Sequence, residues 1–176
     1  MKKFILFLIV AVLLVSVFYG FNPPKTEIPE TQDEPEKITT ETEEENYKKT
    51  VSLFFASSNT LSAEKRQIVL KSESDVYKAV IEELIKGPSV ESLSVTVNPG
   101  TVVNSVTVNN KIATADFTDS LKKLNTGGST KEYLCLYSIV NTLCTFDEID
   151  SVIITINGNK IDTFGQLDTS EAILPE

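Results

Sequence analysis

The stretch GGSTKEYLCLYSIVNTL, residues 127–143, specifies a helix more clearly than any other part of the chain. Ser129 stands where a helix N-cap is expected, and Glu132 follows three residues later, which is the spacing of a capping box. Beyond this start, apolar side chains recur at intervals of three and four residues, the pattern of one helix face. They are Tyr133, Leu136, Tyr137, Val140, Leu143 and Cys144. Because the segments at residues 101–117 and 151–161 are rich in β-branched residues, we expect this face to lie on a sheet.

Strand-like runs surround this helix and a second one. The second helix is expected over residues 75–86, where Gly87 and Pro88 end it. The expected strands are residues 50–56, 65–71, 101–108, 111–117, 151–157 and 160–163. The order ββαββαββ predicts an α+β domain in which two helices pack on one face of a mainly antiparallel sheet. In the fourth strand Ala113, Ala115 and Phe117 form the expected core face, which leaves Asp116 on the outer face.

The amino-terminal residues carry the features of an export segment. Met1-Lys2-Lys3 precedes an uninterrupted apolar run at residues 4–21, about the length needed to cross a bilayer. The two lysines are expected to stay in the cytoplasm, so everything after the run lies outside. No Cys follows the run to carry a lipid, and Phe18-Tyr19-Gly20 lacks the small residues of a cleavage site. We therefore favour an uncleaved single-pass membrane anchor at residues 1–21 over a cleaved signal and a secreted form.

The composition changes sharply between this anchor and the folded part. Residues 22–47 alternate Pro with Glu, Asp and Thr, and they contain almost no hydrophobic residue. Such a segment cannot bury enough apolar surface to offset its ordering entropy, which predicts a disordered acidic linker. The folded domain is expected over residues 48–172, followed by a short tail at residues 173–176. The formal net charge of −9 argues against nucleic acid and anionic lipid headgroups as partners.

Five separate stretches follow the order and pattern of a known family. They are residues 83–88 (ELIKGP), 98–101 (NPGT), 113–117 (ATADF), 128–143 (GSTKEYLCLYSIVNTL) and 164–168 (FGQLD). Together they resemble the GerMN domain, the sporulation and spore germination domain, which occurs in Gram-positive bacteria and in some other cell envelopes. The resemblance spans about residues 50–171. Many relatives carry a lipid-bearing Cys after the apolar run and some carry two copies of the domain, whereas this chain has no such Cys and one copy.

The resemblance implies an envelope protein without known catalysis. In spore-forming bacteria such domains are linked to the assembly of complexes across the envelope, or to remodelling of the cell wall during sporulation and germination. They are also similar to small ring-building domains that associate side by side. These expectations come from the resemblance and not from composition or periodicity.

The sequence lacks several kinds of reactive group. It contains no His, which removes Ser-His-Asp and Cys-His nucleophilic sites as well as His-ligated zinc. Cys135 and Cys144 lie nine positions apart in one expected helix, about 13 Å along its axis, which is beyond the reach of a disulfide. We interpret them as two buried thiols, with pairing to another chain as the alternative.

Carboxylates are the remaining candidates for catalysis. Four of them could supply a glycosidase-like pair: Asp116, Asp119, Glu132 and Asp168. The sequence has no Trp to stack on sugar rings, and strand-end or turn positions favour a structural role for these groups. Asn141 is expected to fasten its helix to a neighbouring loop. Gly127-Gly128 before a helix could hold an anion, but no P-loop Lys accompanies the pair.

The sequence thus favours a non-enzymatic protein with no catalytic, cofactor-binding or metal-binding residue. We expect an assembly or scaffold component of the cell envelope in sporulation or germination, which binds other envelope proteins or itself through sheet edges. The alternative is a peptidoglycan-binding module or an accessory factor of wall remodelling, and a third hypothesis is a wall hydrolase or its regulator.

Overall fold

A long β-hairpin with one buried, apolar face begins the described chain. The computed structural model describes residues 47–176, so the expected membrane segment and nearly all of the expected linker lie outside the described residues. Strands β1 (Tyr47–Ser57) and β2 (Thr60–Leu70) pair antiparallel along their whole length. Ser58, with φ of 58°, makes the turn between them. The inner face of β1 is apolar and buried, and it carries Val51, Leu53 and Phe55.

The first helices follow this hairpin and are fastened to it by polar contacts. A 3-10 turn, η1 (Glu73–Asp75), leads into α2 (Val76–Ile85). Arg66, the single arginine of the sequence, reaches from β2 and donates a hydrogen bond to the carbonyl of Gly87 at 2.9 Å. Its neighbour Glu64 accepts the backbone N–H of Ser89 at 2.8 Å. These contacts satisfy polar groups just after the end of α2, where the helix itself offers no partners.

The second sheet contains four strands in the order β3-β4-β5-β6. They are β3 (Val103–Asn109), β4 (Ile112–Phe117), β5 (Ser151–Ile156) and β6 (Asn159–Lys160). β3 and β4 form an antiparallel hairpin. β4 and β5 are parallel, and helices α3 (Ser120–Asn125) and α4 (Ser129–Leu143) form the crossover that a parallel pair requires. The predicted core face of β4 is confirmed, since Ala113, Ala115 and Phe117 are fully buried.

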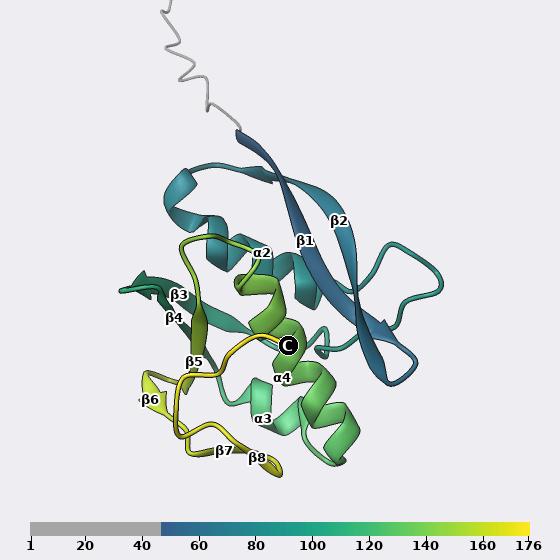
Figure 1. Cartoon of the computed structure of the whole chain (residues 1–176), viewed down its shortest axis with the longest axis vertical. Helices are drawn as coiled ribbons and strands as arrows, with labels where there is room; N and C mark the ends of the chain where they lie inside the picture. The colour runs from purple at the N-terminus through teal and green to yellow at the C-terminus, as the bar shows by residue number, and fades with distance from the viewer. Residues whose placement is uncertain (1–46) are drawn as a thin grey trace, which may run out of the picture. The chain divides into compact units, whose positions relative to one another are not determined.

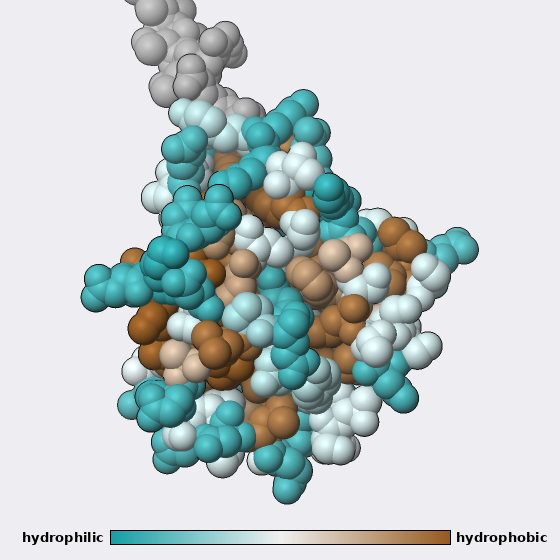
Figure 2. Space-filling view, viewed as in Figure 1, coloured by the Kyte–Doolittle hydropathy of each residue, from teal (hydrophilic) through white to brown (hydrophobic). Residues whose placement is uncertain are grey.

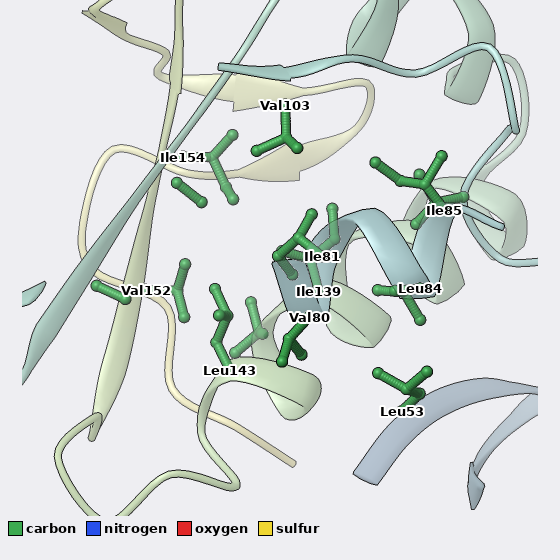
Figure 3. Close-up of a cluster of buried hydrophobic side chains, with 14 of the residues drawn as sticks. Leu53, Val80, Ile81, Leu84, Ile85, Val103, Ile139, Leu143, Val152 and Ile154 are labelled. Atoms are coloured by element: carbon green, nitrogen blue, oxygen red, sulfur yellow. The ribbon is translucent and has the colours of Figure 1, made fainter. Parts of the chain in front are cut away.

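Helices α2 and α4 lie between the β1–β2 hairpin and the four-stranded sheet (Figure 1). Figure 3 shows Leu53 of β1 on one side of the α2 residues Val80 and Leu84. On the other side of the helices, Val152 and Ile154 of β5 point toward Leu143 and Ile139 of α4. One continuous hydrophobic core therefore joins both sheets through the two helices.

The predicted α+β class is confirmed, but the prediction of a single sheet is wrong. The β1–β2 hairpin forms its own sheet, and β7 (Thr163–Phe164) pairs only with β8 (Leu167–Asp168). The reason lies in α4, which is buried on a wider arc than the predicted stripe. Leu134, Cys135 and Ile139 are also buried, although none belongs to that stripe. A helix that is apolar on several sides needs a partner on each of them, and two separate sheets supply those partners.

The last residues of the chain also contribute to the fold. Ile173 is buried, and its backbone exchanges two hydrogen bonds with Val152 of β5, at 2.9 and 2.8 Å. This bridge covers part of the β5 edge that β6 leaves open. Within residues 47–176, no helix is both long enough and apolar enough to span a membrane.

We expect Leu143→Ala to lower the free energy of unfolding by about 2–5 kcal/mol, because the substitution leaves a cavity between α4 and its neighbours. Val69→Ala is the matched control: Val69 is 59 % exposed, so the effect should stay within about 0.5 kcal/mol. Urea unfolding of the wild type and both variants measures the two values. Equal effects of the two substitutions would contradict the position of α4 in the core.

Candidate functional site

Glu132 is a buried carboxylate that joins the start of α4 to the β7–β8 hairpin. Its side chain is 3 % exposed. Oε1 accepts the backbone N–H of Gly127 at 2.9 Å and that of Gly128 at 3.3 Å, while Oε2 accepts the N–H of Gln166 at 2.9 Å. The bonds from Gly127 and Gln166, and more weakly that from Gly128, lower the pKa of Glu132. The charged carboxylate therefore holds together two segments that are distant in sequence.

The predicted Ser129 cap is wrong by one residue, whereas the backward reach of Glu132 is confirmed. The helix begins at Ser129, and Gly128 occupies the N-cap position with φ of 155°. Gly127 before it has φ of 114°, a conformation that residues with a side chain rarely adopt. The two glycines thus turn the chain into the helix, and Glu132 accepts the backbone N–H groups of both.

The contact with Glu132 explains why a glycine stands at position 165, in the FGQLD segment. Its φ is 62°, and a Cβ atom added there would lie 2.0 Å from Cδ of Glu132. Only glycine allows the backbone to approach the carboxylate closely enough for the N–H of Gln166 to reach it. The sequence signal was present as a motif, but its cause depends on a contact between residues more than thirty positions apart.

Asp116 ties together three strands of the larger sheet. Oδ1 accepts the hydroxyl of Thr155 at 2.7 Å and the N–H of Gly158 at 2.8 Å, and Oδ2 accepts the amide of Asn104 at 2.8 Å. Burial alone would raise the pKa of Asp116, but the bonds from Thr155, Gly158 and Asn104 outweigh it and hold the pKa below its usual value. Asp116 thereby connects β3 and β5 to the turn that follows β5.

The other candidate side chains also accept hydrogen bonds within the domain. Asp119 accepts a hydrogen bond from the Asn157 amide at 3.2 Å. Asp168 accepts the backbone N–H of Ser170 at 2.8 Å, and hydrogen bonds from Ser170 lower its pKa. Asn141 of α4 accepts the backbone N–H of Glu176 at 3.1 Å. This last bond fastens the helix to the end of the chain. The sequence could not show that the partner of Asn141 would be the C-terminal segment.

All four acidic candidates accept hydrogen bonds from groups of the domain itself. Asp116 and Asp119 both contact the turn after β5, while Glu132 and Asp168 are engaged elsewhere. A general acid in glycoside hydrolysis needs a raised pKa, whereas the pKa values of Asp116, Glu132 and Asp168 are lowered. In the described part of the chain, no three carboxylate or thiol groups gather closely enough to bind a metal ion.

Both cysteines are free thiols held in protonated form. Cys135 lies in the core, and Cys144 is half-buried at the C-cap of α4. Burial raises the pKa of Cys135 to about 12 and that of Cys144 to about 11. Neither thiol therefore has the thiolate character of a nucleophile or metal ligand at neutral pH.

Two open hollows lie beside a pair of tyrosines on α4. The rings of Tyr133 and Tyr137 are 4.7 Å apart between centroids. Tyr133, Asn141 and Phe54 line a hollow of about 260 Å³, and Tyr137 lines another of about 460 Å³ together with the C-terminal segment. Figure 2 shows hydrophobic residues in separate patches among hydrophilic ones on the face seen in Figure 1. None of Asp116, Asp119 and Glu132 lines these hollows.

The fold and its contacts define a small α+β domain whose acidic side chains brace its own loops. The chain belongs to the Germane family, described as sporulation and spore germination, whose model matches residues 21–162. This confirms the resemblance inferred from the five sequence stretches. No curated protein sequence matches the chain.

Solved structures with this fold include two from Bacillus subtilis and one from Clostridium perfringens. The first GerMN domain of the B. subtilis sporulation protein GerM has a TM-score of 0.57 at 21 % identity, over 72 % of this chain and 97 % of that one. The tandem GerMN domains of GerM have a TM-score of 0.55 at 22 % identity, and the match covers 70 % of this chain and 44 % of that one. A C. perfringens protein provisionally assigned as a lipoprotein has a TM-score of 0.52 at 18 % identity, and the match covers 73 % of this chain and 87 % of that one.

We expect Gly165→Ala to destabilise the domain more than Gly158→Ala. Both glycines have positive φ, 62° and 76°, so an alanine costs about 1–2 kcal/mol of backbone strain at either site. Only at Gly165 does the new Cβ overlap the Glu132 carboxylate, because Gly158 has open space around it. Urea unfolding of both variants, with and without Glu132→Ala, measures the difference. Equal losses would contradict the Glu132 contact.

The stability of the domain should fall at acidic pH. Unfolded Glu and Asp have pKa values of about 4.3 and 3.9, and those of Glu132 and Asp116 are lower in the folded chain. Their stabilisation is therefore fully present above about pH 5 and is lost as pH falls through the folded pKa values.

We expect Glu132→Gln and Asp116→Asn each to flatten this pH dependence, measured as the urea midpoint between about pH 6 and pH 3. Glu91→Gln, which removes an exposed carboxylate, serves as the control and should keep the wild-type slope. A wild-type midpoint that stays constant over this range would show that neither carboxylate is linked to folding.

Proposed function

We propose that this chain is a non-enzymatic assembly component of the cell envelope, tethered to the membrane through residues 4–21 with its folded domain outside the cell. Membership of the sporulation and spore germination family supports a role in one of those processes. Under this proposal the domain acts by contacting other envelope proteins or further copies of itself.

The observation that carries the proposal is that the buried and half-buried acidic side chains hold the fold together. Glu132 and Asp116 each accept three hydrogen bonds from groups that hold the fold together, so neither is available to a substrate without loss of structure. The two thiols are protonated, and the sequence has no His. What the domain offers to other molecules is backbone at strand edges and side chains on its surface.

A second candidate is a peptidoglycan-binding module. The neighbouring rings of Tyr133 and Tyr137 support it, together with Asn59 and Asn141, which line a hollow beside Tyr133. Aromatic faces combined with a few amide groups are common in sites that bind small ligands. Both hollows are open to solvent, and a branched wall polymer would have room to lie across them.

Two measurements on the full chain in detergent distinguish these functions. If the chain is an assembly component, sedimentation velocity will show concentration-dependent association, and purified peptidoglycan sacculi will retain little of it. The opposite pattern would favour the binding module, which Tyr133→Ala with Tyr137→Ala should then weaken. Turnover of labelled wall fragments that disappears in Asp116→Asn would contradict a non-enzymatic function.

A further inference from the structure

The strand edges of the two larger sheets differ in how they are protected. On the outer edge of β1, Ala56 exchanges two backbone hydrogen bonds with Ser94, and the N–H of Phe54 donates to the Thr142 hydroxyl at 3.0 Å. The outer edge of β5 is covered by β6 and by Ile173. Among residues 47–176, no strand or isolated bridge pairs with the outer side of β3. This edge is open for backbone pairing.

The composition of the β3 edge favours pairing as well. Residues 101–110, TVVNSVTVNN, contain no charged residue and no Pro, although 23 % of the chain is charged. Exposed edge strands are usually blocked by Lys, Pro or a bulge, and β2 follows this rule with the exposed Lys65. The register shift in β3 lies between Val103 and Ser105, at one end of the strand. Residues 105–109 therefore form a regular, uncharged and unblocked edge.

The pairing with β4 determines which groups of β3 face outward. The two-residue turn at Asn110 and Lys111 closes on the pair Asn109 and Ile112, so alternate residues from Asn109 bond to β4. By this alternation Val106 and Val108 direct their N–H and C=O groups away from the sheet, and Thr107 lies between them with an exposed side chain.

We propose that β3 pairs antiparallel with β3 of a second copy of this chain, across a two-fold axis at Thr107. Val106 of each copy then exchanges hydrogen bonds with Val108 of the other, and the two Thr107 residues face each other as a non-hydrogen-bonded pair. The two four-stranded sheets become one continuous sheet. This inference rests on the proposed function and names the surface through which the chain associates.

A second copy is the partner that suits this edge best. In an isologous pair each residue faces its own type or a close neighbour in the strand, so any charge near the axis would face the same charge. β3 has none, and its central contacts are Thr with Thr, Val with Val, and Ser105 with Asn109. The paired stretch is short. Tethering to a common membrane would raise the effective concentration of the copies enough for a short edge to associate.

Cysteine cross-linking of the full chain in membranes tests the pairing. In a non-hydrogen-bonded pair the Cα atoms are about 4.5 Å apart, within the range of a disulfide. We expect Thr107→Cys, in a Cys144→Ser background, to form disulfide-linked dimers under copper-phenanthroline oxidation. Gln67→Cys is the control, because it places an exposed thiol on β2. Dimer yields that are as low for Thr107→Cys as for Gln67→Cys would contradict the β3 interface.

A charge-swap measurement identifies the partner as β3 itself. Thr107→Lys and Thr107→Glu should each lose the concentration-dependent sedimentation of the wild type, and an equal mixture of the two should recover it. Gln67→Lys adds the same charge on β2 and should behave as the wild type. If Thr107→Lys still associates while Gln67→Lys does not, assembly stands but the β3 assignment is wrong. A wild-type chain that stays monomeric at all concentrations would contradict both proposals.

Discussion

The burial of α4 on several sides is the constraint on which the rest of the structure depends. Leu136, Ile139 and Leu143 are almost fully buried, and the β1–β2 hairpin and β5 cover different sides of the helix. Because the helix must be covered from more than one direction, the β1–β2 hairpin and the four-stranded sheet stay separate, and the helix lies in the crossover between the parallel strands β4 and β5. Glu132 then fixes the start of this helix against the β7–β8 hairpin.

The elements with strong local signals could be predicted from the sequence. Hydrophobic period, turn residues and the Gly87-Pro88 stop located both main helices and the β3–β4 hairpin, and the α+β class followed from their order. The division into separate sheets could not be predicted, because it depends on which sides of α4 find partners. The cap predicted at Ser129 lies one residue earlier, because Gly127 and Gly128 make the turn into the helix and Glu132 accepts their N–H groups. The further contact of Glu132 with Gln166 could not be predicted, because Gln166 lies far along the chain.

The chain belongs to the sporulation and spore germination family, and its best-bonded acidic groups hold parts of the fold together. A carboxylate bound by three donors, as Glu132 is, stabilises loops and is poorly suited to proton transfer in a substrate cleft. The outer backbone groups of β3, in contrast, have no strand beside them in the described residues. Under the proposed function, this uncharged edge is the surface through which the domain assembles.

Amide hydrogen exchange at the edge of β3 tests this account most directly. Exchange rates are measured on the full chain in membranes, at low and at high protein density. The account predicts that the amides of Val106 and Val108 exchange rapidly at low density and become protected at high density, while those of Lys65 and Gln67 on β2 do not change. Protection confined to β2, or amides in β3 that exchange equally fast at both densities, would contradict it.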